Sequence, residues 1–404
     1  QNSKLPTDAL WYLDFTNNRH MSSALQTIRL DSNAEYVSFT HAVFGSIPVS
    51  SFLSAVDQGW LGNYPKITGR MIRQNPPISR ATAMGYLDQT RQGQRSTRQA
   101  HATPIPDEDN DDEFLRVTVL PANELMNSSD ATGRFPITTK SGWEYLLVST
   151  LGGYVHLQLL KSRSKGEYVR AYKLMYDYFH QYGHHPTIQR LDNETSSDLE
   201  VFLRACDVKI QYVPPGIHRQ NPSERAIRHT KNCIIAMCTT ADPSIPAHIL
   251  FEEVVPQAEI VINQVRPWSP NPRINAWTGF RRAEYDHLAH PMSIFGMKVV
   301  IHEKPPVRGT WAQHGKDGFY LAPALSHYRS WHVYVSETGG TRVSDTLAWF
   351  PKPFKMPGHS PLEQLTAAVV DLDNAVSNLT SAGMETLQPV SPIFQSTCST
   401  SVKH

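Results

Sequence analysis

The segment from Phe114 to about Met237 constrains the fold more than any other part of the chain. It contains two apolar runs rich in β-branched and aromatic residues, WEYLLVST and YVHLQLLKS, which are separated by Gly152 and Gly153. Two such runs joined by two glycines predict a β-hairpin. Helix-like and strand-like patterns alternate after the hairpin. This order predicts an α/β fold in which helices cover a mixed sheet.

The alternation can be followed element by element. The stretch GEYVRAYKLMYDYFHQYG carries apolar residues at helical spacing and ends at Gly183. Two short strands, TIQRLDNE and KIQYVPP, lie on either side of the predicted helix SSDLEVFLRACDV. A last helix, SERAIRHTKNCIIAMC, has Ser223 as its cap candidate.

Three acidic residues stand out from ordinary surface carboxylates. Asp130 lies in SSDATGRFP, Asp192 in RLDNE, and Glu224 in HRQNPSERAIRHTKN. Each is expected at the end of a strand or helix, where a sheet edge can gather the three. Converging carboxylates suit a pair of Mg²⁺ ions that act on a phosphodiester. The alternative is structural, with Asp192 in a turn and Glu224 as a first-turn acid that complements the helix dipole. Glu194 and Asp198 are nearby substitutes for the second acid.

Composition and the lack of other motifs narrow the possible functions. The sequence has neither a GxSxG nucleophile motif nor a GxxxxGK[ST] phosphate loop. A formal net charge of +1 means that any nucleic-acid surface must be local. Four cysteines in 404 residues argue against a disulfide framework and favour a reducing compartment. Neither a membrane span nor a signal peptide is expected, and the start at Gln1 is consistent with a piece of a longer polyprotein.

The rest of the chain divides by composition. We expect a small helical module at 34–98, an acidic linker at 99–113 and an α/β core at 114–285. A β-rich module is expected at 286–357, because Trp331, Val333 and Val335 alternate before the turn SETGG. The tail at 358–404 carries a short amphipathic helix pattern that could assist oligomerisation.

The sequence predicts different roles for two groups of cationic residues. Arg228 and Lys231 share a helix face with Glu224, which favours contact with DNA phosphates over a merely exposed ion-paired helix. In contrast, Lys161, Arg163 and Lys165 are expected to belong to a solvated strand-to-helix turn.

The three acidic motifs, in their order along the chain, resemble the integrase core of retroviruses and retrotransposons, specifically the copia-type lineage. Further resemblance lies in NQVRPWSPNPRINAW, SIFGMKVVIHEKP and GFYLAPALSHYRSWHVYVSETGGTRVSDTLAWF, and in an N-terminal stretch similar to a pre-integrase segment. The resemblance implies a ribonuclease-H-like mixed five-stranded sheet flanked by helices. It also implies that Asp130, Asp192 and Glu224 are the catalytic and metal-binding residues, with Mg²⁺ or Mn²⁺ as two ions.

On the same resemblance the substrates are the DNA ends of the element and its target DNA, and the protein is a homo-oligomer in the nucleus. Gln220 and Asn221 match the family's polar loop and are expected to contact DNA with Arg228 and Lys231. The gap of 32 residues from Asp192 to Glu224 is slightly shorter than is usual in the family. Two other functions remain open, namely a catalytically inactive nucleic-acid-binding remnant and a ribonuclease-H-like nuclease that cuts without joining.

Structural zinc is not expected, although integrases often carry an N-terminal zinc domain. The chain up to the end of the N-terminal module at residue 98 has His20 and His41 but no cysteine. A second set, His229, Cys233, Cys238 and His248, fits no common zinc spacing, and buried helix cysteines are the expected alternative.

Overall fold

The computed structural model describes residues 32–87, 126–191, 197–212, 222–304, 308, 310–350 and 369. The chain separates into two units, 1–355 and 356–404, and every described residue except Val369 belongs to the first. The predicted acidic linker lies outside the described residues, as does the amphipathic pattern of the tail apart from Val369.

Among the described residues, four short helices precede the first sheet in the sequence. They are α2 (Asn33–Val43), α3 (Val49–Asp57), α4 (Gly69–Gln74) and α5 (Arg80–Tyr86). Three of them begin at hydroxyl caps, since Ser32, Thr68 and Ser79 each accept a hydrogen bond from a backbone N–H of the first turn. These helices lie in the region where the sequence predicts a small helical module, and the bounds of that module stay a prediction.

The first sheet has five strands in the order β3-β2-β1-β4-β5. Its strands are β1 (Met126–Ala131), β2 (Tyr145–Leu151), β3 (Tyr154–Leu160), β4 (Ile188–Leu191) and β5 (Lys209–Tyr212). β2 is antiparallel to both β1 and β3, whereas β4 is parallel to both β1 and β5. The hairpin prediction is confirmed, because the β2–β3 turn is made by Gly152 and Gly153 at φ of 57° and 93°.

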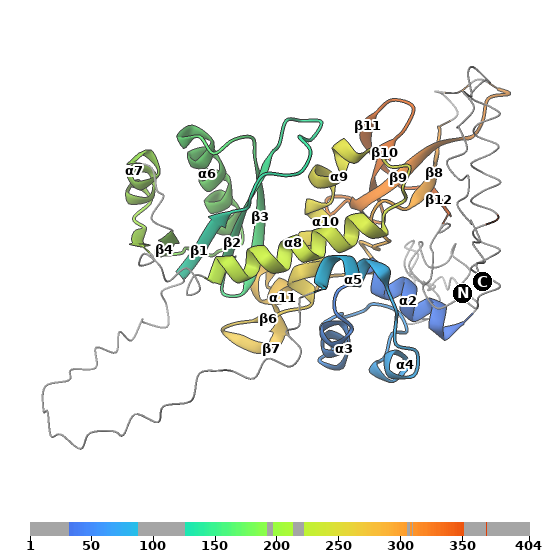
Figure 1. Cartoon of the computed structure of the whole chain (residues 1–404), viewed down its shortest axis with the longest axis horizontal. Coiled ribbons are helices and arrows are strands. Elements are labelled where there is room, and N and C mark those ends of the chain that lie inside the picture. Colours follow the sequence, from blue (N-terminus) through green and yellow to red (C-terminus); the bar gives the residue numbers. More distant parts are fainter. Residues whose placement is uncertain are drawn as a thin grey trace, which may run out of the picture. The chain divides into compact units, whose positions relative to one another are not determined.

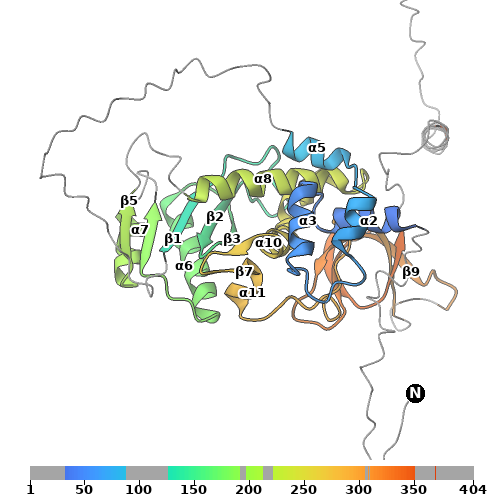
Figure 2. The same cartoon turned by 90° about the horizontal axis from the view of Figure 1, so that it is seen from below.

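Helices cover both faces of this sheet. They are α6 (Lys165–Gln181), α7 (Ser197–Ala205) and α8 (Pro222–Thr240). Figure 2 shows α6 and α8 on opposite faces, with β1, β2 and β3 between them. Helix α8 starts one residue before the predicted cap, so Ser223 lies within its first turn. The five-stranded mixed sheet flanked by helices confirms the predicted α/β fold, and its strand order and directions are those of the ribonuclease-H-like class.

Helix α8 extends from the first sheet toward a second one (Figure 1). Between them in the sequence lie α9 (Ala247–Glu253), α10 (Val255–Gln264), the short pair β6 (Pro267–Trp268) and β7 (Asn271–Asn275), and α11 (Ala276–Arg281). The second sheet has the order β11-β10-β9-β8-β12. Its strands are β8 (Lys298–His302), β9 (Gly315–Pro323), β10 (Trp331–Val335), β11 (Gly340–Ser344) and β12 (Leu347–Phe350).

One continuous apolar core joins these parts. It includes Phe44 and Phe52 of the N-terminal helices, Phe179 of α6, and Trp331 in the second sheet. Helix α5 packs on α8 so closely that Gly85 faces the carbonyl oxygen of Asn232. No helix among the described residues is long and apolar enough to cross a membrane.

Candidate functional site

The predicted site residues are distributed over the first sheet and α8. Asp130 is the penultimate residue of β1, and Glu224 lies in the first turn of α8. Asp192 follows directly after the last residue of β4, but it lies outside the described residues, as do Gln220 and Asn221.

Contacts along β1 determine which way Asp130 points. The Asn127 amide donates to Gln189 at 2.8 Å and lies 3.6 Å from the Met175 sulfur of α6. Ser129 lies 2.5 Å from the hydroxyl of Tyr172, also on α6. Side chains alternate between the two faces of a strand. Asp130 therefore projects from the face opposite α6, which is the face that α8 covers.

Strand β4 follows the same pattern beside β1. Gln189 faces α6, since the Tyr176 hydroxyl donates to it at 3.0 Å. Arg190 consequently points to the other face, where its guanidinium donates to Gln211 of β5 at 3.1 Å. Ser128 of β1 is paired with Arg190. Because β1 and β4 are parallel, their carboxyl ends lie at the same edge of the sheet.

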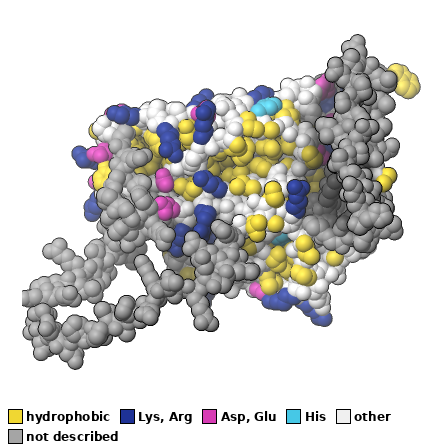
Figure 3. All heavy atoms as spheres, viewed as in Figure 1, with side chains coloured by type: hydrophobic (Ala, Val, Ile, Leu, Met, Phe, Trp, Pro, Cys, Tyr) yellow, Lys and Arg dark blue, Asp and Glu magenta, His cyan; other side chains and the backbone are white. Residues whose placement is uncertain are grey.

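The first half of α8 has a buried side and a cationic side. Ser223, Ala226 and Thr230 are buried, whereas Glu224 is half-buried, and Arg228 and Lys231 are exposed. Positions separated by three or four residues lie on one helix face. Glu224 thus lies on the same side of α8 as the two cations, as the sequence predicts. In Figure 3, Lys and Arg side chains lie near acidic ones over the first sheet and the beginning of α8.

Asp198, the substitute acid, lies in the first turn of α7. It is exposed, and the Ser197 hydroxyl lies 3.4 Å from its carboxylate. Glu194 lies outside the described residues. Among the residues that the structure describes, no three His, Cys, Asp or Glu side chains form a group that could hold a metal ion.

Of the histidine and cysteine set, His229, Cys233 and Cys238 lie on α8, and His248 lies exposed on α9. Cys233 is buried beneath α5 and directs its thiol to the Met237 sulfur at 3.8 Å. Burial raises the pKa of the Cys233 thiol to about 12, and burial lowers the pKa of His229 to about 4. A thiol that resists ionisation is a poor metal ligand, so these residues favour the packing interpretation.

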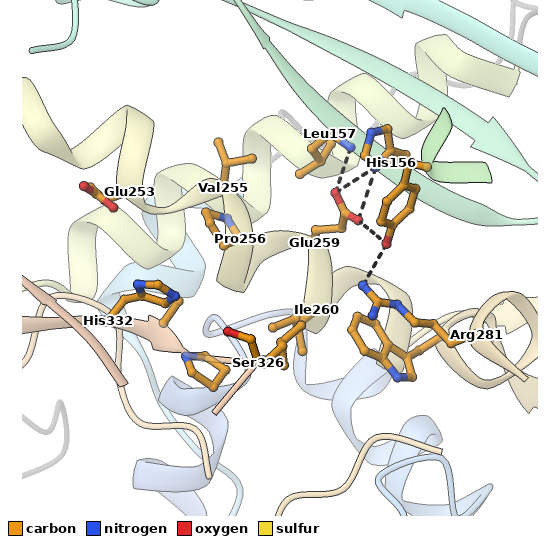
Figure 4. A pocket seen from close by; sticks show the side chains of 15 residues that line it. His156, Leu157, Glu253, Val255, Pro256, Glu259, Ile260, Arg281, Ser326 and His332 are labelled. Carbon is orange, nitrogen blue, oxygen red and sulfur yellow. Dashed lines mark hydrogen bonds and ion pairs between the residues drawn. The ribbon is translucent and has the colours of Figure 1, made fainter. Parts of the chain in front are cut away.

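A pocket of about 590 Å³ opens between the two sheets and was not anticipated from the sequence. Figure 4 shows its polar wall, where Glu259 of α10 contacts His156 of β3. Arg281 of α11 lines the same wall. The Glu259 carboxylate accepts hydrogen bonds from the Tyr154 hydroxyl at 2.7 Å and from the Leu157 N–H at 2.9 Å. It also lies 3.3 Å from the His156 Nδ1. Glu259 is therefore engaged in holding β3 rather than free to meet a ligand.

The sequence contains a signal for this arrangement, although it is weak. Glu259 and Asn263 are four residues apart in the largely apolar stretch VVPQAEIVINQV. Polar residues at that spacing lie on one face of a helix. Both side chains face β3.

Comparisons with known proteins add little at the level of sequence. No protein-family model matches the chain, and no curated protein matches it. Among solved structures it is similar to a chain of the simian T-cell lymphotropic virus intasome in complex with PP2A regulatory subunit B56 gamma. That likeness has 15% identity and a TM-score of 0.30, and it covers 58% of this chain and 83% of that chain.

A second similar structure is the HTLV-2 integrase catalytic core domain in complex with magnesium. It shows 17% identity and a TM-score of 0.28, over 40% of this chain and 96% of that chain. The ribonuclease-H-like fold class rests on strand order and strand direction in the first sheet.

Proposed function

We propose that this protein is a metal-dependent polynucleotidyl transferase of the integrase type, encoded by a copia-like retrotransposon. It would process the 3′ ends of element DNA and join them to target DNA, as a homo-oligomer in the nucleus. The observation that carries this proposal is that Asp130 projects from the face of β1 on which α8 packs, while Glu224 lies in the first turn of α8.

The strand register supports adding Asp192 to this pair. Ser128 of β1 pairs with Arg190 of the parallel strand β4. Asp130 is two residues beyond Ser128, and Asp192 is two residues beyond Arg190. Equal offsets from a parallel pair lead to neighbouring positions on the same face. We infer that the three acids converge where β1 and β4 end beneath the start of α8.

The donor chemistry fits a hard divalent cation. The site would supply carboxylate oxygens, which Mg²⁺ and Mn²⁺ prefer, and both Asp130 and Glu224 remain partly exposed. Asp130 would contribute to both of two ions, with Asp192 and Glu224 each completing one. When bound, such ions stabilise charge on the attacking and leaving oxygens of an in-line displacement.

The proposed activity comprises two reactions. In end processing, water attacks a phosphodiester, so that the element DNA keeps a 3′-hydroxyl and the released nucleotides carry the 5′-phosphate. In strand transfer, that 3′-hydroxyl attacks a target phosphodiester, forms a new one and releases a target 3′-hydroxyl. Arg228 and Lys231 lie exposed on the side of α8 that carries Glu224, where cations can hold the phosphates in place. Gln220 and Asn221 are proposed to contact the DNA end.

The test is an assay with a labelled element-end duplex and Mn²⁺ or Mg²⁺. The wild type should yield joined products, and Asp130→Asn or Glu224→Gln should reduce them by about 100-fold or more. Asp177→Asn, an exposed acid on α6, is the matched control and should retain activity. Metal-dependent nicking without joining would assign the protein to the nucleases. DNA binding without any metal-dependent chemistry would identify an inactive remnant.

A further inference from the structure

Strand directions bring a second set of cations to the edge where β1 ends. β1 and β3 are each antiparallel to β2, so they run the same way and their carboxyl ends lie at one edge. The turn from β3 into α6 carries Lys161, Arg163 and Lys165, all of them exposed. We refer to these three residues as the β3–α6 cation edge. From the sequence alone, these residues are expected to belong to a solvated turn.

The guanidinium of Arg163 is held in place rather than free in solvent. It donates to the carbonyl oxygen of Thr132 at 3.0 Å and lies 5.3 Å from the centre of the Tyr145 ring. Thr132 is itself fixed, since its N–H donates to Leu146 O at 2.8 Å and its hydroxyl accepts from Leu146 N at 3.1 Å. Thr132 is only two residues beyond Asp130. A cation is thus fixed next to the strand end that carries the candidate catalytic acid.

The neighbouring acids are paired with arginines outside this edge. Glu144 is paired with Arg134. Glu167 is paired with Arg170 at 2.7 Å, and this contact holds the pKa of Glu167 below its usual value. Each acid therefore has an arginine partner outside the cation edge. Glu167 also accepts a hydrogen bond from the Lys161 N–H at 2.9 Å, and its charge acts on Lys161, so Arg163 and Lys165 are the members of the edge that these two acids leave uncompensated.

Aromatic rings also limit the motion of the flanking cation. The Lys161 ammonium lies 5.0 Å from the centre of the Trp143 ring, and Arg170 lies 5.3 Å from the same ring. Lys165 is the first residue of α6, whose N-terminal end carries partial positive charge from the helix dipole. Cations that are already held in place lose less conformational entropy on binding a phosphate than mobile side chains do.

We propose that the β3–α6 cation edge binds the phosphodiester backbone of DNA on the side of Asp130 opposite α8. A nucleic-acid strand crossing the end of β1 would then meet cations on both sides, from this edge and from Arg228 and Lys231. Phosphate contacts of this type set register and orientation and do not read the base sequence. The inference deepens the proposed function and rests on it for the identity of the polymer.

The test measures DNA binding without chemistry. Fluorescence anisotropy of a labelled mixed-sequence duplex in EDTA gives the binding constant over a range of KCl concentrations. Each phosphate contact contributes about 0.9 to the slope of log K against log salt concentration. The triple variant Lys161→Ala, Arg163→Ala, Lys165→Ala should reduce that slope by about 2 to 3. Arg163→Lys should keep the slope but weaken binding, because lysine lacks the planar fork and the ring stacking.

Matched controls distinguish the effect of this surface from the effect of removing any positive charge. Lys173→Ala removes an exposed cation from the same helix, and Lys298→Ala removes one from the second sheet. Both should bind with the wild-type slope. A triple variant that unfolds at the wild-type temperature and also keeps the wild-type slope would overturn the proposal.

The outcome is independent of the catalytic test. Asp130→Asn should abolish joining while the slope in EDTA stays unchanged. Suppose that neither the wild type nor any variant joins DNA, but the triple variant still lowers the slope. The binding role of the cation edge is then supported, and the transferase function is rejected. If joining is present and the slope is unaffected by the triple variant, the binding edge fails alone.

Discussion

The Asn263 side chain on α10 and the backbone of Val155 on β3 form a closed pair of hydrogen bonds. The Val155 N–H donates to the Asn263 Oδ1 at 2.7 Å, and the Asn263 Nδ2 donates to the Val155 carbonyl at 2.7 Å. β3 is an edge strand of the first sheet, so these backbone groups have no strand partner there. Other side chains bond further backbone groups on this edge of β3, because Glu259 accepts a hydrogen bond from Leu157 N and Arg170 donates one to Leu159 O.

We expect Asn263→Ala to destabilise the protein by about 2–5 kcal/mol, because it leaves a buried N–H and a buried carbonyl without partners. The free energy of unfolding from urea titration measures this change. Asn271→Ala, at an exposed position of β7, is the control and should stay within about 0.5 kcal/mol of the wild type. An equal effect of the two substitutions would contradict the role of Asn263 in closing the edge.

Glu259 makes the same edge sensitive to acid. Burial alone would raise the pKa of its carboxyl, but His156, the Tyr154 hydroxyl and the Leu157 N–H together hold it below the usual value of 4.5. A carboxyl with a lowered pKa in the folded state stabilises the fold at pH values above the unfolded pKa. That stabilisation is lost as the pH falls through the folded pKa.

Glu259→Gln should therefore cost about 2–4 kcal/mol at neutral pH, since the single amide oxygen cannot accept all the hydrogen bonds that reach the two carboxylate oxygens. It should also flatten the decline of stability below pH 4.5. Urea unfolding at a series of pH values measures both effects. The exposed Glu284→Gln is the comparison and should leave the wild-type pH profile in place.

His41 gives a second and separate pH dependence. Its Nε2–H donates to the Ile47 carbonyl at 2.6 Å, and burial lowers its pKa from 6.5 to about 4. The unfolded chain takes up the proton first as the pH falls below 6.5. Stability should consequently decrease between pH 6.5 and about 4, by about 3 kcal/mol from this group, and then level off.

Other buried histidines act in the same direction, since burial also lowers the pKa of His287 to about 3. His41→Gln keeps a donor for Ile47 but removes the titration, so its unfolding free energy should vary less over that pH range. His248→Gln, at an exposed position, should retain the wild-type slope. Identical slopes for all three proteins would show that His41 does not contribute.

Local patterns predicted the elements of the first sheet, because each of them is determined by neighbouring residues. The glycine pair at 152–153, the apolar stripe of α6 and the strand before Asp192 each carry their own periodicity. Positions of Asp130 and Glu224 on β1 and α8 followed from these elements. The face from which Asp130 projects did not, since it depends on long-range contacts such as that between Ser129 and Tyr172.

The cover of β3 and the fixed position of Arg163 could not be predicted for a related reason. Asn263 lies 108 positions from Val155, and Arg163 lies 31 positions from Thr132. No periodicity within a single segment reports contacts of that separation. The α5–α8 contact is of this kind too, and its tightest point is a glycine that sequence alone would treat as a weak helix residue.

The packing of α5 on α8 can be tested by a substitution at Gly85. A Cβ at this position would lie 2.5 Å from the Asn232 carbonyl and 2.9 Å from the Ala236 Cβ. Gly85→Ala should therefore push α5 away from α8 and cost about 1–3 kcal/mol, although alanine favours helices elsewhere. Gly166→Ala in α6 is the matched control, because no atom lies within 4 Å of its added Cβ. It should be neutral or stabilise by up to about 1 kcal/mol. Urea unfolding compares the two, and a Gly85→Ala protein as stable as Gly166→Ala would show that α5 does not depend on this close approach.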